Sequence, residues 1–136
     1  MGQYFVVCNL DKKEFVHPHK LGSGLKLWEQ LAAHPGTGAA LIVLCASLPQ
    51  QRGGGDLTIN TRSKGYVGRW AGDRIAIIGD YACPGDIPGV DASAIYRACM
   101  EDDEWKDVSD GVCKVIEQEL GGKFEGEGWR DFVTKG

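Results

Sequence analysis

The stretch YVGRWAGDRIAIIGDY, residues 66–81, carries the clearest strand pattern in the chain. Isoleucine and alanine occupy both faces of its second half, which is typical of a strand covered on both sides. The Ala-Gly-Asp segment in its middle suits a tight turn, because Gly72 can adopt the positive φ that such turns require. We therefore predict a hairpin of residues 66–70 and 74–81, whose second strand is central in a sheet.

Another hairpin is predicted at the start of the chain. Residues 3–9 are aromatic and β-branched, and residues 14–17 regain this character after a polar turn. Pro18 should end the second strand, because proline cannot donate a ladder hydrogen bond.

Helical patterns occupy much of the remaining chain. After the N-cap residue Ser23, apolar residues at helical spacing predict a core-facing stripe made of Leu21, Leu25, Trp28 and Leu31. Further helices are predicted at residues 38–48, 91–100 and 109–120. Together with the two hairpins, they predict an α+β fold of two layers, with the helices packed on one face of an antiparallel sheet.

The chain is predicted to form a single globular domain over residues 1–136, since this length is typical of one domain. A glycine-rich loop at about residues 49–65 should be mobile. The polar C-terminal tail, about residues 123–136, contains aromatic side chains that should pack back on the domain, namely Phe124, Trp129 and Phe132.

Composition and cysteine spacing favour a soluble cytoplasmic protein. The best apolar run, Ala39–Leu44, is far shorter than the ~18 residues of a membrane span. Five cysteines are an odd number and include no C-x-x-C pair, which disfavours a disulfide framework or a zinc ribbon. Cys83 lies in a turn-like segment, and the other cysteines are predicted to be buried, reduced thiols: Cys8, Cys45, Cys99 and Cys113.

Charge is distributed unevenly along the sequence. Residues 1–74 contain nine Lys/Arg and five Asp/Glu, whereas residues 75–136 contain six and fourteen, within a net charge of −4. The densest acidic segment is predicted to be an interaction surface made of Glu101, Asp102, Asp103, Glu104, Asp107 and Asp110. The leading hypothesis is a non-enzymatic protein that docks this surface on a basic surface of another macromolecule. The net acidity disfavours direct nucleic-acid binding, although residues 52–74 are locally basic.

An alternative hypothesis is a ligand- or metal-binding domain, or a hydrolase, centred on a pocket. His17 and His19 should face the same way on an extended chain and could bind one metal ion with a third ligand. Asp80 is a candidate acid, Cys83 a candidate nucleophile, and Tyr81 lies between them. No second cluster has metal-ligand spacing and no familiar catalytic motif is present, so we expect no metal and no cofactor. Convergence of these five residues would favour the pocket, and scattering would favour the interaction protein.

Two blocks of the sequence resemble a group of small, uncharacterised bacterial and phage proteins. The first lies within residues 2–28 and contains GQYFVVCNLDKKEF, PHK and GLKL; the second lies within residues 66–82 and contains GRWAGDRI and GDY. The resemblance covers about a third of the chain and implies a phage or mobile-element setting in a bacterial cell. In that setting the partner of the acidic surface would be a host or phage protein, and this chain its inhibitor or regulator. The resemblance implies no activity, and it assigns no functional residue.

Overall fold

The computed structural model describes residues 2–47, 57 and 65–134. The predicted glycine-rich loop therefore lies outside the described residues, apart from Leu57 and Gly65. None of the described helices is long and apolar enough to cross a membrane.

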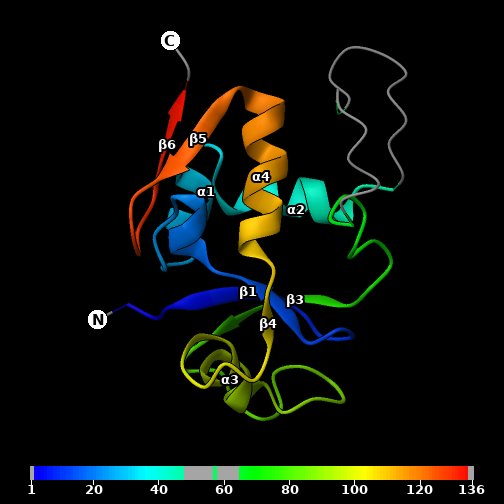
Figure 1. Ribbon diagram of the computed structural model, residues 1–136. Coiled ribbons are helices and arrows are strands. Elements are labelled where there is room, and N and C mark those ends of the chain that lie inside the picture. Colours follow the sequence, from blue (N-terminus) through cyan, green and yellow to red (C-terminus); the bar gives the residue numbers. More distant parts are fainter. Residues whose placement is uncertain (1, 48–56, 58–64, 135–136) are drawn as a thin grey trace.

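A mixed four-stranded sheet forms the centre of the fold (Figure 1). Its strands are β1 (Phe5–Asn9), β2 (Glu14–Val16), β3 (Ile75–Gly79) and β4 (Lys106–Asp107), in the order β3-β1-β2-β4. The predicted first hairpin forms, with Val7 of β1 opposite Val16 of β2. On its other side, β1 pairs antiparallel with β3, and β4 joins β2 in parallel. The α+β class is confirmed, but the sheet is mixed rather than antiparallel.

The second predicted hairpin does not form, because residues 66–70 bond to a helix instead of to β3. The backbone N–H groups of Gly68 and Trp70 donate to the carbonyls of Val43 and Leu44, at 2.9 and 2.8 Å. These carbonyls lie in the last turn of α2 (Gly36–Cys45), where they have no partner within the helix. Among the described strands β3 is an edge strand rather than a central one, and Ile77 is 52% exposed.

Helices cover both faces of the sheet, so the domain has three layers rather than the two predicted. One face carries a 3-10 turn, η1 (Pro18–Leu21), with α1 (Glu29–Ala32), α2 and α4 (Ser109–Leu120). The other face carries η3 (Ala92–Ala94) and α3 (Ile95–Met100). Alternate residues of β1 serve the two cores, because successive strand side chains point to opposite faces.

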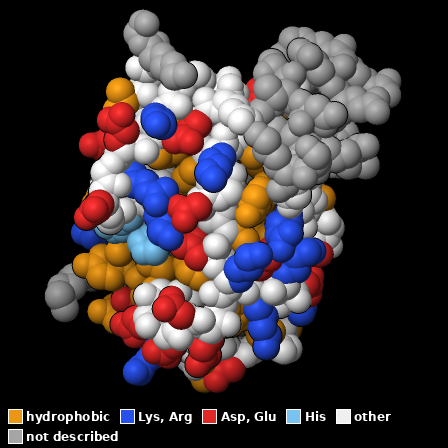
Figure 2. All heavy atoms as spheres, viewed as in Figure 1, with side chains coloured by type: hydrophobic (Ala, Val, Ile, Leu, Met, Phe, Trp, Pro, Cys, Tyr) orange, Lys and Arg blue, Asp and Glu red, His pale blue; other side chains and the backbone are white. Residues whose placement is uncertain are grey.

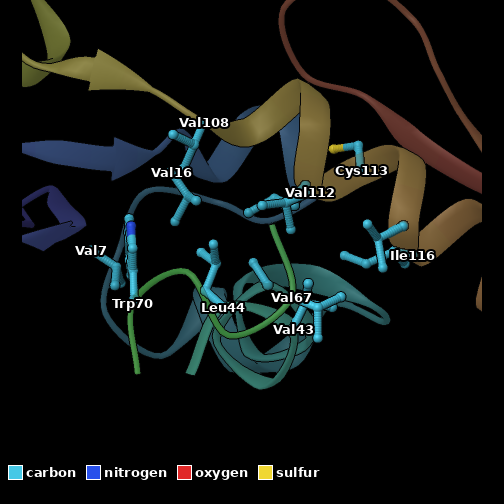
Figure 3. Packing of buried hydrophobic residues seen from close by; sticks show 13 residues of the cluster. Val7, Val16, Val43, Leu44, Val67, Trp70, Val108, Val112, Cys113 and Ile116 are labelled. Atoms are coloured by element: carbon cyan, nitrogen blue, oxygen red, sulfur yellow. The ribbon is translucent and has the colours of Figure 1, made fainter. Parts of the chain in front are cut away.

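Val7 belongs to the larger core, which surrounds the fully buried Trp70 (Figure 3). Val6 and Cys8 belong to the smaller core beneath α3. The sheet is therefore buried on both sides although it contains antiparallel pairs.

The predicted apolar stripe is buried only at its start: Leu21 is fully buried in the larger core and Leu25 is half-buried, whereas Trp28 and Leu31 are exposed. Only Glu29–Ala32 form an α-helix, and Trp28 is 75% exposed. The buried residue of α1 is Gln30, whose amide donates to the carbonyls of Phe5 and Leu25 at 2.9 and 3.2 Å. The Leu25 carbonyl also accepts the Phe5 N–H at 2.9 Å, so the contribution particular to Gln30 is the donor that it supplies to the Phe5 carbonyl.

The C-terminal residues form a hairpin rather than a tail. Strands β5 (Gly122–Glu125) and β6 (Asp131–Thr134) pair antiparallel. The rings of Phe124 and Phe132 lie edge to face, with 5.0 Å between their centroids, and both pack against the larger core. The backbone N–H of Arg130 donates to the carbonyl of His19 at 2.8 Å, which joins the hairpin to η1.

All five cysteines are free thiols. Cys8, Cys99 and Cys113 are buried as predicted, whereas Cys45 is exposed, as is Cys83. The prediction for Cys45 is wrong because α2 is apolar all round, so periodicity could not identify its outward face.

Candidate functional site

Acidic side chains gather on one face of the sheet. The segment between β3 and β4, residues 80–104, is here called the acidic layer. It contains seven carboxylates and one arginine, a net charge of −6, which leaves +2 on the rest of the chain. Figure 2 shows Asp and Glu side chains over the region of α3. The carboxylates belong to Asp80, Asp86, Asp91, Glu101, Asp102, Asp103 and Glu104.

The densest part of the acidic layer is an exposed turn directly after α3. All four residues from Glu101 to Glu104 are exposed. The backbone N–H groups of Glu101 and Asp102 donate to the carbonyl of Arg97, at 2.9 and 3.0 Å, and Glu104 donates to Ala98 at 2.9 Å. These bonds hold the turn, so its carboxylates project from an ordered backbone. The guanidinium Nε of Arg97 lies 3.5 Å from a carboxylate oxygen of both Glu101 and Asp102.

Two residues of the predicted acidic surface lie elsewhere. Asp107 is half-buried and accepts a hydrogen bond from Lys20 Nζ at 2.8 Å and from the Ser109 N–H at 2.8 Å. Asp110 lies on α4, 2.9 Å from the Arg130 guanidinium. Asp107 in β4 and Asp110 in α4 therefore lie outside the acidic layer, which contains the other four residues of the predicted surface, the run 101–104.

A second candidate site is a cavity of about 510 Å³ between η1 and the turn that joins β5 to β6. Its polar wall contains His17, His19, Lys20 and Arg130, and its apolar wall contains Leu25 and Met100. Figure 2 shows His side chains beside Lys and Arg side chains and above hydrophobic ones.

The two histidines lie together and favour their neutral form. Their ring centroids are 5.5 Å apart. Burial, with a smaller contribution from the nearby His19, lowers the pKa of His17 below its usual value, and burial lowers the pKa of His19. His17 Nδ1 accepts the backbone N–H of His19 at 3.2 Å, which places the proton of a neutral His17 ring on Nε2. The His17 N–H donates to the Ser109 hydroxyl at 2.7 Å and so fixes this segment on α4.

The five residues of the predicted pocket do not converge. Asp80 and Cys83 do not line the cavity of the histidines; Tyr81 lines a separate cavity of about 230 Å³, beside β3. Asp80 instead accepts the backbone N–H of Tyr4 at 2.9 Å. The reason is the strand order: β1 lies between β2 and β3, which keeps these two strands about 10 Å apart. Among the described residues, no group of three or more His, Cys, Asp and Glu side chains is placed to hold a metal ion.

Sequence reasoning missed the two cations of the histidine cavity. Lys20 follows His19 directly, whereas Arg130 arrives from the opposite end of the chain through the C-terminal hairpin. The ring of Trp129 packs edge to face against that of His19, with 4.4 Å between the ring centroids. The sequence contains no local signal for this grouping, because it depends on how β5 and β6 pack.

An apolar groove of about 250 Å³ lies between α1, α2 and β3. Leu27, Trp28, Leu31, Leu41 and Ile77 contribute its apolar wall. It contains much of the stripe that the sequence assigned to the core.

Comparison of the chain with protein-family models, curated proteins and solved structures finds no match. The interpretation of both sites therefore depends on their geometry and charge.

Proposed function

We propose that this is a non-enzymatic binding protein that docks its acidic layer on a basic surface of a host or phage protein. The observation that carries the proposal is the net charge of −6 in one layer, in a chain whose remainder is +2. The scattering of His17, Asp80 and Cys83 supports the same choice over a hydrolase.

Charge of one sign on one face is suited to attracting a partner of opposite sign. Such complementarity raises the association rate and selects the orientation of docking more than it raises affinity. Screening by salt limits the attraction to about 8 Å at physiological ionic strength, so the exposed run 101–104 should act close to contact. Because backbone hydrogen bonds already hold this turn, little ordering of the main chain is needed on binding.

The chemistry of the acidic layer favours a partner surface rich in Lys and Arg. A surface that otherwise binds nucleic-acid phosphates has this composition. The setting that we propose is the bacterial cytoplasm, with the protein acting as a phage-borne or mobile-element-borne regulator. Nucleic acid itself would be repelled by the acidic layer.

The test compares two charge-neutralised proteins of equal net charge. One carries Glu101→Gln, Asp102→Asn and Glu104→Gln; the control carries Glu125→Gln, Glu127→Gln and Asp131→Asn, which lie in the exposed C-terminal hairpin. A partner is captured from bacterial lysate by the wild-type protein, identified and purified, and its association rate is then measured at low and high salt.

We expect the first variant to associate about tenfold more slowly at low salt, with a flatter salt dependence, because steering is lost. The control should keep the wild-type rate, and duplex DNA should compete with the wild-type protein for the partner. Equal rates for all three proteins would contradict the proposal.

A further inference from the structure

We propose that the cavity between η1 and the β5–β6 turn binds a small organic phosphate monoester. This goes beyond the docking function, because the polar lining of the cavity lies outside the acidic layer, from which only Met100 contributes.

Four nitrogen-containing side chains that can donate hydrogen bonds line this cavity: His17, His19, Lys20 and Arg130. Lys20 and Arg130 are held by Asp107 and Asp110 through single contacts of 2.8 and 2.9 Å. An ammonium group has three N–H donors and a guanidinium has five, so both cations keep donors for a ligand. The proton that neutral His17 carries on Nε2 adds another donor, and His19 lies beside it. Phosphate oxygens only accept hydrogen bonds when ionised, and Arg and Lys are their common partners in proteins.

The lining itself carries a small positive charge in spite of the acidity of the chain. Its charged residues are Lys20, Arg130 and Glu127, a net charge of +1 with both imidazoles neutral. Asp107 and Asp110 do not line the cavity, but they pair with the two cations and bring the net charge of the surroundings to −1, so the attraction for an anion rests on the donors that face the cavity. Both cations are also partly shielded from water, with 32% of the Lys20 side chain and 24% of the Arg130 side chain exposed. Partial burial strengthens their attraction for an anion.

The size and the apolar wall indicate an organic ester rather than inorganic phosphate. A volume of about 510 Å³ is within the ~300–1,000 Å³ typical of small-molecule sites and exceeds the needs of one phosphate group. Leu25 and Met100 can contact the organic part, and the Trp129 ring, which is not in the lining, packs edge to face against His19. The turn contains Gly126 and Gly128, both with positive φ, so no side chain at these positions narrows the cavity.

The test uses adenosine monophosphate and ribose 5-phosphate as probes, with adenosine as the compound that lacks phosphate. Binding is measured by calorimetry at neutral pH to wild-type protein, to Lys20→Gln/Arg130→Gln, and to the control Lys12→Gln/Arg74→Gln. The control also removes two cations: Lys12, which pairs with Asp73, and Arg74, which pairs with Asp11. Neither Lys12 nor Arg74 lines the cavity.

We expect both phosphate esters to bind at millimolar concentrations or below, and adenosine to bind at least about tenfold more weakly. The Lys20/Arg130 variant should lose about tenfold in affinity or more, and the control should match wild type. Absence of binding by either ester, or equal loss in both variants, would overturn the proposal.

A second measurement applies even if the Lys20/Arg130 variant does not fold. In the wild-type protein, NMR should show ligand-induced shifts at His17, His19 and the Trp129 indole. The pKa of both histidines should rise on binding, because a bound anion stabilises the imidazolium form. Shifts confined to other regions, or unchanged histidine pKa values, would also overturn the proposal.

Discussion

Trp70 and Trp28 show that residue type alone does not determine a structural role. Trp70 is fully buried, and its indole N–H donates to Glu14 Oε1 at 2.9 Å. Burial raises the pKa of Glu14, but hydrogen bonds from Arg69 and Trp70 outweigh it, so the pKa lies below its ordinary value. Glu14 is therefore held ionised in the core by two donors from the segment 66–70. Trp28, by contrast, lies on the apolar groove.

Truncation of the two tryptophans should give very different costs. Trp70→Ala should lower the free energy of unfolding by about 3–5 kcal/mol, because it opens a cavity and removes a donor from Glu14. Trp28→Ala should cost under about 1 kcal/mol, because most of this side chain is already in water. Urea unfolding of both variants measures the difference. Similar costs for the two variants would contradict the burial of Trp70 or the exposure of Trp28.

At the scale of the element, Gly111 of α4 and Gly38 of α2 are helix glycines with opposite surroundings. In α4, a Cβ at Gly111 would overlap the ring of Tyr66, so this glycine permits close packing of residues 65–70 on the helix. In α2, a Cβ at Gly38 would meet no atom within 4 Å. One glycine is thus required by packing, whereas the other only weakens its helix.

Alanine substitution at these two glycines should change stability in opposite directions. Gly38→Ala should raise the free energy of unfolding by about 0.5–1 kcal/mol, because alanine loses less backbone entropy in a helix. Gly111→Ala should lower it by about 1–3 kcal/mol, because the Tyr66 ring must move. Thermal and urea unfolding test both variants. Stabilisation by Gly111→Ala would contradict the contact between α4 and Tyr66.

At the scale of the whole molecule, the acidic layer concentrates repulsion on one side of the sheet. Neighbouring carboxylates about 6 Å apart in a high dielectric repel by under ~1 kcal/mol each, which folding can tolerate. The contacts of Arg97 with Glu101 and Asp102 are exposed and offset little of this.

Neutralising the run 101–104 should therefore leave the protein as stable as wild type or slightly more stable. The variant carries Glu101→Gln, Asp102→Asn, Asp103→Asn and Glu104→Gln; asparagine suits position 103, whose φ is +52°. Added salt should stabilise wild type more than the variant, because it screens repulsion that the variant lacks. Urea midpoints at low and moderate ionic strength provide the measurement. A clearly less stable variant would show that these carboxylates support the fold.

Local patterns in the sequence determined the first hairpin, the final helix and the acidic run. Residues 3–9 and 14–17 are close in sequence and joined by a polar turn, so their pairing needs no distant partner. The helix over 109–120 has a clear apolar stripe. It is followed by Gly121, which adopts the left-handed conformation expected of a glycine at the end of a helix. The run 101–104 is exposed, because four adjacent carboxylates are too costly to bury.

Only the tertiary structure decided the partner of β3, the inward face of α1 and the make-up of the histidine cavity. Residues 66–70 leave the expected hairpin because the unpaired carbonyls at the end of α2 accept their N–H groups. Gln30 rather than Trp28 lies in the interior, where its amide donates to the Phe5 carbonyl of β1. His19 meets Arg130 because a C-terminal hairpin packs on η1. Each outcome depends on hydrogen bonds between groups that are far apart in the sequence. Periodicity and composition do not predict which of these groups pair.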